Sequence, residues 1–508
     1  MPFPRQAGIL LHPTSLPGRY GIGEIGPDAR RWLAHLNTMG QKIWQVLPLG
    51  PTGYADSPYQ TLSTFAGNPA LISFDSLRDD SLLQEADLQD FPTFPENYVD
   101  FGPVLAARSK ILQRVAREFD RRATPILKAA WMRFCEDESK WLEDYALFAA
   151  LKDEQGNGPW IDWPEPLRRR EPAALAAARK KHSAAIQQRK VLQFLFFHQW
   201  LSLREEARKR GISLIGDIPI FVAHDSADVW CHPELFFLDS NGSPTVIAGV
   251  PPDYFSATGQ RWGNPLYRWS VHEDQGYAWW IARLRSTLNL YDIVRIDHFR
   301  GFAANWEIPA AESTAIHGRW VPGPGKKLFD AAHQALGDLP IIAEDLGVIT
   351  PDVDALRESL GFPGMRILQF AFGDDPKAAE FRPESYPANC VVYTGTHDND
   401  TTVGWYQSEP GQDSTRNLDQ IAREQHNVRT YLSSNGSQIH WDLMGLALRS
   451  NANTAIYPLQ DVLGLGSSAR MNTPGREQGN WSWRFRWEQL SQGVEQRLRL
   501  MTQEAGRA

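Results

Sequence analysis

Residues 292–302 read D-I-V-R-I-D-H-F-R-G-F and place Arg295 and Asp297 two residues apart in an apolar run. Because side chains alternate across a strand, these two charges share one face, whereas Val294 and Ile296 occupy the other. A buried aspartate must hold a proton unless a partner compensates it, so the Arg295 guanidinium indicates how Asp297 stays ionised, as a nucleophile must. Taken alone, the motif fits a structural ion pair better than a prepared nucleophile, because structural pairs also shift pKa values.

Eight short apolar runs, one of them in this stretch, end in polar residues or in Gly/Pro punctuation, with helical patterns between them. The runs are 8–11, 43–47, 213–215, 293–296, 341–343, 365–368, 391–393 and 455–459. Strands that alternate with helices indicate parallel βα units, and eight such units predict an α/β fold, a closed (β/α)8 TIM barrel. The carboxyl ends of barrel strands form the active face, so the polar residues after the runs predict one site. A doubly wound open sheet is the structural alternative.

We expect one barrel domain over residues 1–508, with two insertions. About 165 residues separate the second and third runs, and region 70–205 between them should be mainly helical, because apolar positions recur at helical spacing. Between the third and fourth runs, segment 221–269 holds G-V-P-P-D-Y-F-S-A-T-G-Q-R-W-G-N-P, which fits a lid over a ligand or a rigid irregular loop. Only 49 residues follow Leu459, so we expect no C-terminal β-sandwich, which takes roughly 100 residues.

Composition narrows the function classes. A net charge of −8 and a pI near 5.9 argue against a nucleic-acid partner, because phosphate binding needs a basic surface. The three cysteines lie far apart in no metal-like spacing, which fits a reducing compartment without disulfides. The first residues show no signal-peptide pattern and no segment has the length of a membrane span, so we expect a soluble cytoplasmic protein without a membrane partner. Protein partners cannot be read from the sequence.

Three carboxylates carry the chemical argument. Asp297 follows the fourth run, Glu344 follows the fifth in P-I-I-A-E-D-L-G, and Asp398 follows the seventh in V-V-Y-T-G-T-H-D-N-D. Neighbouring strands lie about 4.8 Å apart. The first two carboxyl groups can therefore approach the roughly 5 to 5.5 Å that a retaining glycosidase needs. Glu344 follows an apolar run and has Asp297 as a like-charged neighbour, so its pKa should rise and make it the acid of the pair.

Motifs along nearly the whole chain resemble those of one family. R-I-D-H-F-R-G, A-E-D-L-G, G-T-H-D-N-D, D-S-P-Y-Q and G-V-P-P-D-Y-F occur together, between G-I-L-L-H-P-T-S-L-P and S-A-R-M-N-T-P-G. On these motifs the chain resembles the 4-α-glucanotransferases, also called amylomaltases or disproportionating enzymes, of the α-amylase clan. The resemblance implies Asp297 as nucleophile, Glu344 as general acid/base and Asp398 as transition-state stabiliser. The substrate-binding positions that it implies are Tyr59, Asp217, Arg295, His397, Gln260, Trp262, Phe370, Asp253 and Tyr254.

The same resemblance implies a reaction. An α-1,4-glucan segment would pass through a covalent glycosyl-aspartate intermediate to the 4-hydroxyl of an acceptor glucan or of glucose. Malto-oligosaccharides and α-1,4-glucans would be donors and acceptors, and no cofactor or metal is expected. Without its motif, His397 fits a satisfied loop histidine, and Tyr59 fits an aromatic that covers the core. For His12, His224 and His298, packing and substrate contact are equally good interpretations.

Other classes of protein stay open at this point. A metal-dependent barrel hydrolase would use clustered histidines and carboxylates, whereas His12 stands alone near the first run. A non-catalytic glucan-binding protein would keep the aromatic surfaces of the 19 tryptophans without needing three carboxylates. Within the enzyme class, a transferase differs from a hydrolase in whether a sugar or water reaches the intermediate, and the sequence does not decide between them.

Overall fold

A sheet of eight parallel strands forms the centre of the computed structural model, which describes residues 3–252, 256, 258–411 and 416–508. The strands follow one another in the order β10-β11-β12-β1-β2-β3-β6-β9. Their bounds are β1 Gln6–Leu10, β2 Ile43–Gln45, β3 Ser213–Pro219, β6 Ile293–Asp297, β9 Ile341–Ala343, β10 Gly364–Ile367, β11 Cys390–Tyr393 and β12 Thr454–Pro458. The two end strands approach each other where the Ala343 N–H donates to the Pro363 carbonyl at 3.0 Å. The predicted (β/α)8 barrel is confirmed, with a strand at each predicted run.

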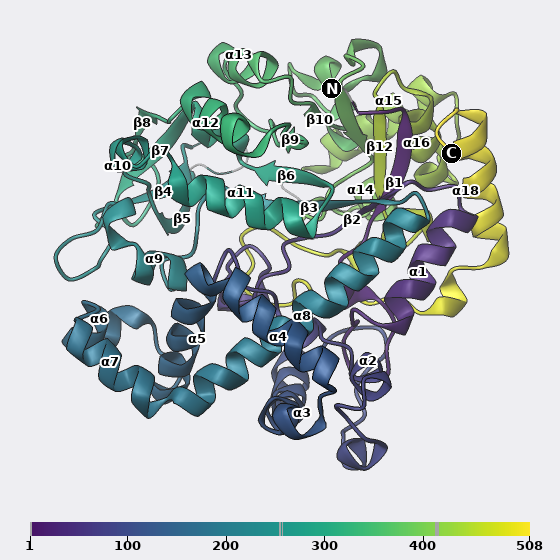
Figure 1. Cartoon of the computed structure of the whole chain (residues 1–508). Coiled ribbons are helices and arrows are strands. Elements are labelled where there is room, and N and C mark those ends of the chain that lie inside the picture. Colours follow the sequence, from purple (N-terminus) through teal and green to yellow (C-terminus); the bar gives the residue numbers. More distant parts are fainter. Residues whose placement is uncertain (1–2, 253–255, 257, 412–415) are drawn as a thin grey trace.

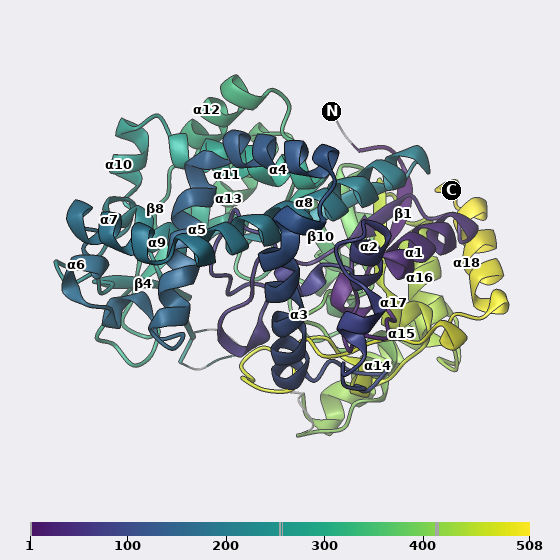
Figure 2. The same ribbon diagram turned by 60° about the horizontal axis from the view of Figure 1, so that its bottom comes forward.

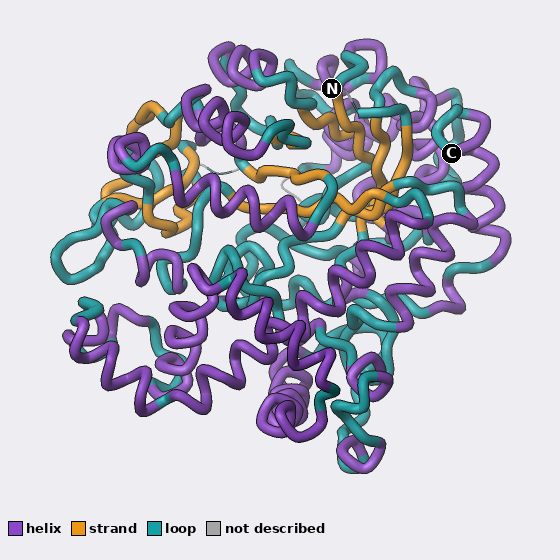
Figure 3. The backbone as a smooth tube through the Cα atoms, viewed as in Figure 1, coloured by secondary structure: helices purple, strands orange, loops and turns teal. Residues whose placement is uncertain are grey.

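Helices surround the strands, which gather at the centre of the molecule (Figure 3). All five residues of β1 are buried, and parallel strands covered on both faces read as apolar runs for this reason. The helix α1 illustrates the covering layer: Pro27 and Asp28 favour its first turn, and Trp32 and Leu36 lie on its buried face. The helices around and after the barrel are α1 Pro27–Thr38, α11 Ala278–Leu290, α12 Lys326–Leu336, α13 Pro351–Ser359, α14 Thr402–Gln407, α15 Leu418–Leu432, α16 Ile439–Arg449, α17 Leu459–Val462 and α18 Gln492–Glu504.

The long connection between β2 and β3 is mainly helical, and its helices lie together on one side of the barrel (Figures 1 and 2). Its helices are α2 Phe74–Asp79, α3 Phe101–Arg122, α4 Pro125–Asp137, α5 Ser139–Glu154, α6 Glu165–Arg168, α7 Pro172–Lys181 and α8 Ser183–Lys209. The apolar periodicity over 124–151 and 172–209 looks continuous in the sequence, yet each stretch is two helices. Glu138 and His182 leave the helical backbone conformation, with ψ of 9° and 17°, and let the chain change direction there.

A second, four-stranded antiparallel sheet, which none of the eight apolar runs predicted, lies beside the barrel (Figure 1). It has the order β5-β4-β7-β8 and is made of β4 Val246–Val250, β5 Gln260–Pro265, β7 Ala304–Pro309 and β8 Arg319–Pro322. Two short helices, α9 Ala227–Cys231 and α10 Trp269–Asp274, flank its first hairpin. Segment 221–269 thus contributes two paired strands, and one of them, β4, also pairs with β7 from the chain after β6.

Beyond β12, residues 459–508 form short helical turns and α18 rather than a β-sandwich. Within the ranges that the structure describes, no helix combines the length and the apolar character that crossing a membrane requires.

Candidate active site

A cavity of about 460 Å³ lies where the carboxyl ends of several barrel strands meet. Side chains that follow β2, β6 and β11 reach it, as expected for a barrel that builds its site from many strands. Its lining includes Tyr59, Trp262, Asp297, His298, His397 and Asp398. Residues that the sequence singled out from widely separated motifs therefore lie around one space.

Arg295 joins two carboxylates beside this cavity. The pairing of β3 with β6 sets Asp217 opposite Arg295, and the guanidinium donates to both oxygens of Asp217, at 2.9 and 2.7 Å. The same guanidinium donates to Asp297 Oδ1 at 2.9 Å. Burial lowers the pKa of Arg295, but the charges of Asp217 and Asp297 outweigh burial and raise that pKa well above its ordinary value. Asp297 is 33% exposed and faces the cavity, so a ligand can reach a carboxylate that a permanent cation holds in place.

Glu344 directly follows β9, the neighbour of β6, which brings its carboxyl group near that of Asp297. Its Oε2 accepts from the His298 N–H at 2.7 Å and its Oε1 from the Leu346 N–H at 2.8 Å. Burial raises the pKa of Glu344 to about 8, and the charge of Asp297 adds to the rise against the opposing charge of Arg295. Glu344 is partly exposed, although it is not among the described residues that line the cavity.

Tyr59 and His397 form an aromatic wall of the cavity. The rings stack with centroids 5.0 Å apart and planes 15° apart. The Tyr59 hydroxyl donates to Asp217 Oδ2 at 2.8 Å, and burial together with Asp217 raises the pKa of Tyr59 well above its ordinary value. Tyr59 therefore remains neutral, and through Asp217 it links the aromatic wall to Arg295.

Asp398 lies on the loop after β11, with its side chain 47% exposed to the cavity region. Asn472 Nδ2 donates to Asp398 Oδ1 at 2.6 Å, and the Arg470 guanidinium donates to the Asp398 carbonyl at 2.7 Å. His397 Nε2 lies 3.4 Å from the same Oδ1. The orientation of Asp398 thus depends on residues that follow β12.

Of the remaining predicted substrate positions that the structure describes, only Trp262 lines the cavity. Trp262 and Gln260 lie on β5, and the Trp262 indole N–H donates to Gln260 Oε1 at 3.1 Å. Trp262 lines the cavity, whereas Gln260 does not. Phe370, also outside the described lining, is 36% exposed. Asp253 and Tyr254 lie outside the described residues.

His298 has an unusual backbone next to Asp297. Its φ and ψ are 56° and 49°, a left-handed conformation that costs on the order of 1 to 3 kcal/mol in a residue other than glycine. The Trp262 ring packs edge-on against the imidazole, with centroids 4.7 Å apart. Burial lowers the pKa of His298 to about 4, although Asp297 opposes the shift, and Nε2 has no hydrogen-bond partner among the described residues. This strained turn directs a neutral imidazole to the cavity, and it places the main-chain N–H of His298 where it donates to Glu344.

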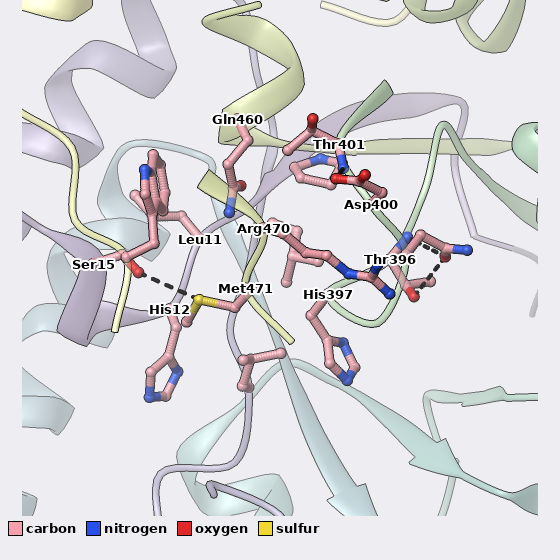
Figure 4. A pocket seen from close by; sticks show the side chains of 15 residues that line it. Leu11, His12, Ser15, Thr396, His397, Asp400, Thr401, Gln460, Arg470 and Met471 are labelled. Atoms are coloured by element: carbon pink, nitrogen blue, oxygen red, sulfur yellow. Dashed lines mark hydrogen bonds between the residues drawn. The ribbon is translucent and has the colours of Figure 1, made fainter. Parts of the chain in front are cut away.

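The other two histidines that the sequence left open differ from each other. Burial lowers the pKa of His12 to about 3, with a further contribution from His397, and both histidines line a second, smaller cavity (Figure 4). His224 bonds the Gly242 carbonyl at 2.8 Å. In the described ranges, no group of three or more His, Cys, Asp or Glu side chains has an arrangement that could hold a metal ion.

Asn472 and Trp481 are functional candidates that the sequence analysis did not single out. Both line the cavity, and the Trp481 ring lies 5.9 Å from each ring of the aromatic wall. The signal for Asn472 was present in S-A-R-M-N-T-P-G, a motif quoted only for the resemblance. Trp481 falls in the alternating run N-W-S-W-R-F-R-W, where the pattern does not distinguish it from Trp483; both side chains are buried.

Comparisons with known proteins agree with one another. The model of glycoside hydrolase family 77, described as 4-alpha-glucanotransferase, matches residues 11–490. The chain is 51% identical to the 4-alpha-glucanotransferase of Thermus thermophilus, over 99% of each chain. It is 47% identical to that of Synechocystis, over 99% of this chain and 98% of the relative.

Solved structures extend the likeness to the fold. An amylomaltase from Streptococcus agalactiae in complex with acarbose matches with a TM-score of 0.93 and 38% identity, covering 99% of this chain and all of that one. An amylomaltase from Corynebacterium glutamicum shares the fold, with a TM-score of 0.79 at 17% identity over 98% of this chain and 75% of that one.

Proposed function

Because this chain belongs to the glycoside hydrolase 77 family of 4-alpha-glucanotransferases, we propose that it transfers α-1,4-glucan segments by a retaining double displacement on Asp297. The observation that carries the proposal is the pair of unlike carboxyl groups. Arg295 binds the carboxylate of Asp297, whereas burial and Asp297 raise the pKa of Glu344 to about 8. One group is prepared to attack and its neighbour to give a proton.

In the first half-reaction, Asp297 attacks the anomeric carbon of the donor glucose and Glu344 protonates the departing glycosidic oxygen. The donor segment is then an ester of Asp297, and the leaving glucan departs with a new hydroxyl group. In the second half-reaction, Glu344 removes the proton from the 4-hydroxyl of an acceptor, which attacks the same carbon and releases Asp297. Two inversions retain the α configuration.

The other side chains of the site would bind the donor sugar. His397 and Asp398 can hydrogen-bond ring hydroxyls, and such bonds strengthen as the sugar distorts toward an oxocarbenium ion. Tyr59 and Trp262 can cover sugar faces, and we propose that segment 221–269 acts as a lid that limits the entry of water. Malto-oligosaccharides and longer α-1,4-glucans would be both donors and acceptors, and glucose an acceptor. The binding of acarbose by the Streptococcus agalactiae amylomaltase supports a site for oligosaccharides of this kind.

Incubation with maltotriose tests the proposal. Transfer predicts glucose and a ladder of longer maltodextrins with almost no gain in reducing ends, whereas a steady gain would show hydrolysis. Asp297→Asn should abolish both outcomes and leave thermal unfolding close to that of the parent protein. Full activity in this variant would overturn the assignment of the nucleophile.

A further inference from the structure

The loop that carries His397 and Asp398 is attached at both ends to one buried carboxylate. Residues 394–401 connect β11 to α14, and Asp461 lies on α17, directly after β12. Asp461 Oδ2 accepts from the Thr394 hydroxyl at 2.6 Å and from the Thr402 hydroxyl at 2.7 Å. Its Oδ1 accepts from the Thr402 N–H at 2.6 Å. The side chains of Thr394, Thr402 and Asp461 are completely buried, so no solvent competes for these bonds.

Further residues after β12 hold the middle of the same loop. Ser467 donates to Asp400 Oδ2 at 2.7 Å, Arg470 to the Asp398 carbonyl at 2.7 Å, and Asn472 to Asp398 Oδ1 at 2.6 Å. Figure 4 shows the two segments facing each other, with Thr396, His397, Asp400 and Thr401 on one side and Gln460, Arg470 and Met471 on the other. The cavity that these residues line together with His12 and Ser15 has a volume of only about 20 Å³, so the two segments pack closely on this side of the loop.

We infer that Asp461 is a positioning residue for the transfer reaction, which holds loop 394–401 in the conformation that presents His397 and Asp398 to the donor sugar. The inference rests on the proposed function, because it requires that Asp398 acts on the donor. A group that is ordered before the substrate arrives loses no conformational freedom at the transition state. A carboxylate suits this position because it offers only acceptors to three donors.

The isosteric variant Asp461→Asn tests the inference. The amide oxygen of the variant can replace one carboxylate oxygen. Its NH2 group, however, either faces the Thr402 N–H, which is also a donor, or forces the Thr394 and Thr402 hydroxyls to accept instead of donate. We expect kcat for maltotriose disproportionation to fall about 10- to 100-fold, with KM changed less than threefold. Thr394→Val should show part of this loss, whereas Thr394→Ser, which keeps the hydroxyl, should restore it. This matched pair keeps the test valid if Asp461→Asn does not fold.

Asp292→Asn is the control for a general effect on stability. Asp292 precedes β6 at the opposite end of the barrel and accepts from the Leu214 N–H of β3 at 3.0 Å. This variant should lower the melting temperature and leave kcat unchanged. An Asp461→Asn protein that behaves in the same way, or equal kcat values for Thr394→Val and Thr394→Ser, would overturn the positioning role.

A double-mutant cycle with Asp398→Asn separates this inference from the proposed function. The residual activity of the variants is measured as fluoride released from α-maltosyl fluoride, an activated donor. If Asp461 acts through the loop that carries His397 and Asp398, adding Asp461→Asn to Asp398→Asn should cost less than Asp461→Asn costs in the wild-type protein, because the position of Asp398 no longer matters. Losses that multiply would overturn the inference. Wild-type activity in Asp398→Asn alone would instead refute the proposed role of Asp398.

Discussion

Two opposing influences set the protonation of Glu344. Burial and the charge of Asp297 raise the pKa to about 8, whereas Arg295 and the N–H groups of Leu346 and His298 lower it. The first influences prevail, so the carboxyl group carries a proton at neutral pH, as a general acid must. Ordinary glutamates titrate near pH 4.3 and would be ionised there.

The activity of the free enzyme should therefore decline in alkaline solution. Glu344 has to be protonated for the first half-reaction, and its proton is lost as pH rises through about 8. We expect kcat/KM for maltotriose to fall tenfold per pH unit above that value, measured as glucose released in a pH series. A profile that stays flat to pH 10 would contradict the role of Glu344 as the acid.

The same shift predicts a dependence of stability on pH. The folded protein binds the Glu344 proton up to about pH 8, whereas the unfolded chain releases it near the ordinary glutamate pKa. Between these two values folding becomes less favourable as pH rises, and above about 8 the penalty is constant. Glu344→Gln removes a group that ionises, so it should raise the melting temperature more at pH 8 than at pH 5. An equal gain at both pH values would show that the shift is absent.

At the scale of elements, β1 depends on the absence of a side chain at Gly8. A Cβ atom built there would lie 2.3 Å from Ile43 Cβ and 2.6 Å from the Ile43 carbonyl oxygen on β2. Neither atom can retreat without moving a strand of the barrel. The close contact between these strands therefore requires glycine.

Gly8→Ala should destabilise the protein by about 1 to 3 kcal/mol, the usual effect of overpacking a core. Gly102→Ala is the matched control, because Gly102 lies in the first turn of α3 with open space at its Cβ position. That variant should be neutral or slightly stabilising, since alanine favours helices. Chemical denaturation measures both, and a Gly8→Ala protein as stable as the control would refute the packing argument.

The second sheet shows why one element escaped the sequence analysis. Its strands come from two separate segments, β4 and β5 before β6, and β7 and β8 after it. β4 pairs with β7, although the barrel strand β6 lies between them in the sequence. The register of the β4–β5 pairing shifts between Ile247 and Gly249. Pairing over such a distance leaves no local turn signal of the kind that predicts a hairpin.

At the scale of the whole molecule, Arg507 connects the last residues to the barrel. Its guanidinium is buried and donates to five carbonyl groups at distances of 2.6 to 3.2 Å. The acceptors belong to residues before and at the starts of β1 and β12, namely Gln6, Leu448, Ser450, Ala452 and Asn453. Burial lowers the pKa of Arg507 to about 10, which leaves it charged at neutral pH.

Arg507→Met keeps an unbranched apolar side chain at this position and removes every donor. The variant loses these five hydrogen bonds, although Arg5 still donates to the carbonyl groups of Leu448, Ser450 and Ala452. We therefore expect the melting temperature to fall by several degrees while kcat stays unchanged. The exposed Arg499 on α18 provides the control, and Arg499→Met should leave the melting temperature as it is. Equal melting temperatures for the two variants would show that Arg507 does not stabilise the barrel.

The sequence by itself determined the barrel and the approximate positions of its chemistry. Strand runs are visible because burial on both faces demands apolar residues, and this requirement acts on each strand separately. The carboxylates after the runs were predicted to meet because parallel strands end at one face. Asp297, His397 and Asp398 do border one cavity, with Glu344 next to Asp297.

Only the tertiary structure decided which partners complete these groups. Arg295 binds Asp217 as well as Asp297 because β3 and β6 pair in one particular register. Asn472 holds Asp398 from a segment 74 residues away in the chain. Phe370, which the motif match placed near the substrate path, is outside the described lining of the cavity. Local sequence patterns report which face of an element is buried, whereas these contacts depend on register and packing between elements that are remote in sequence.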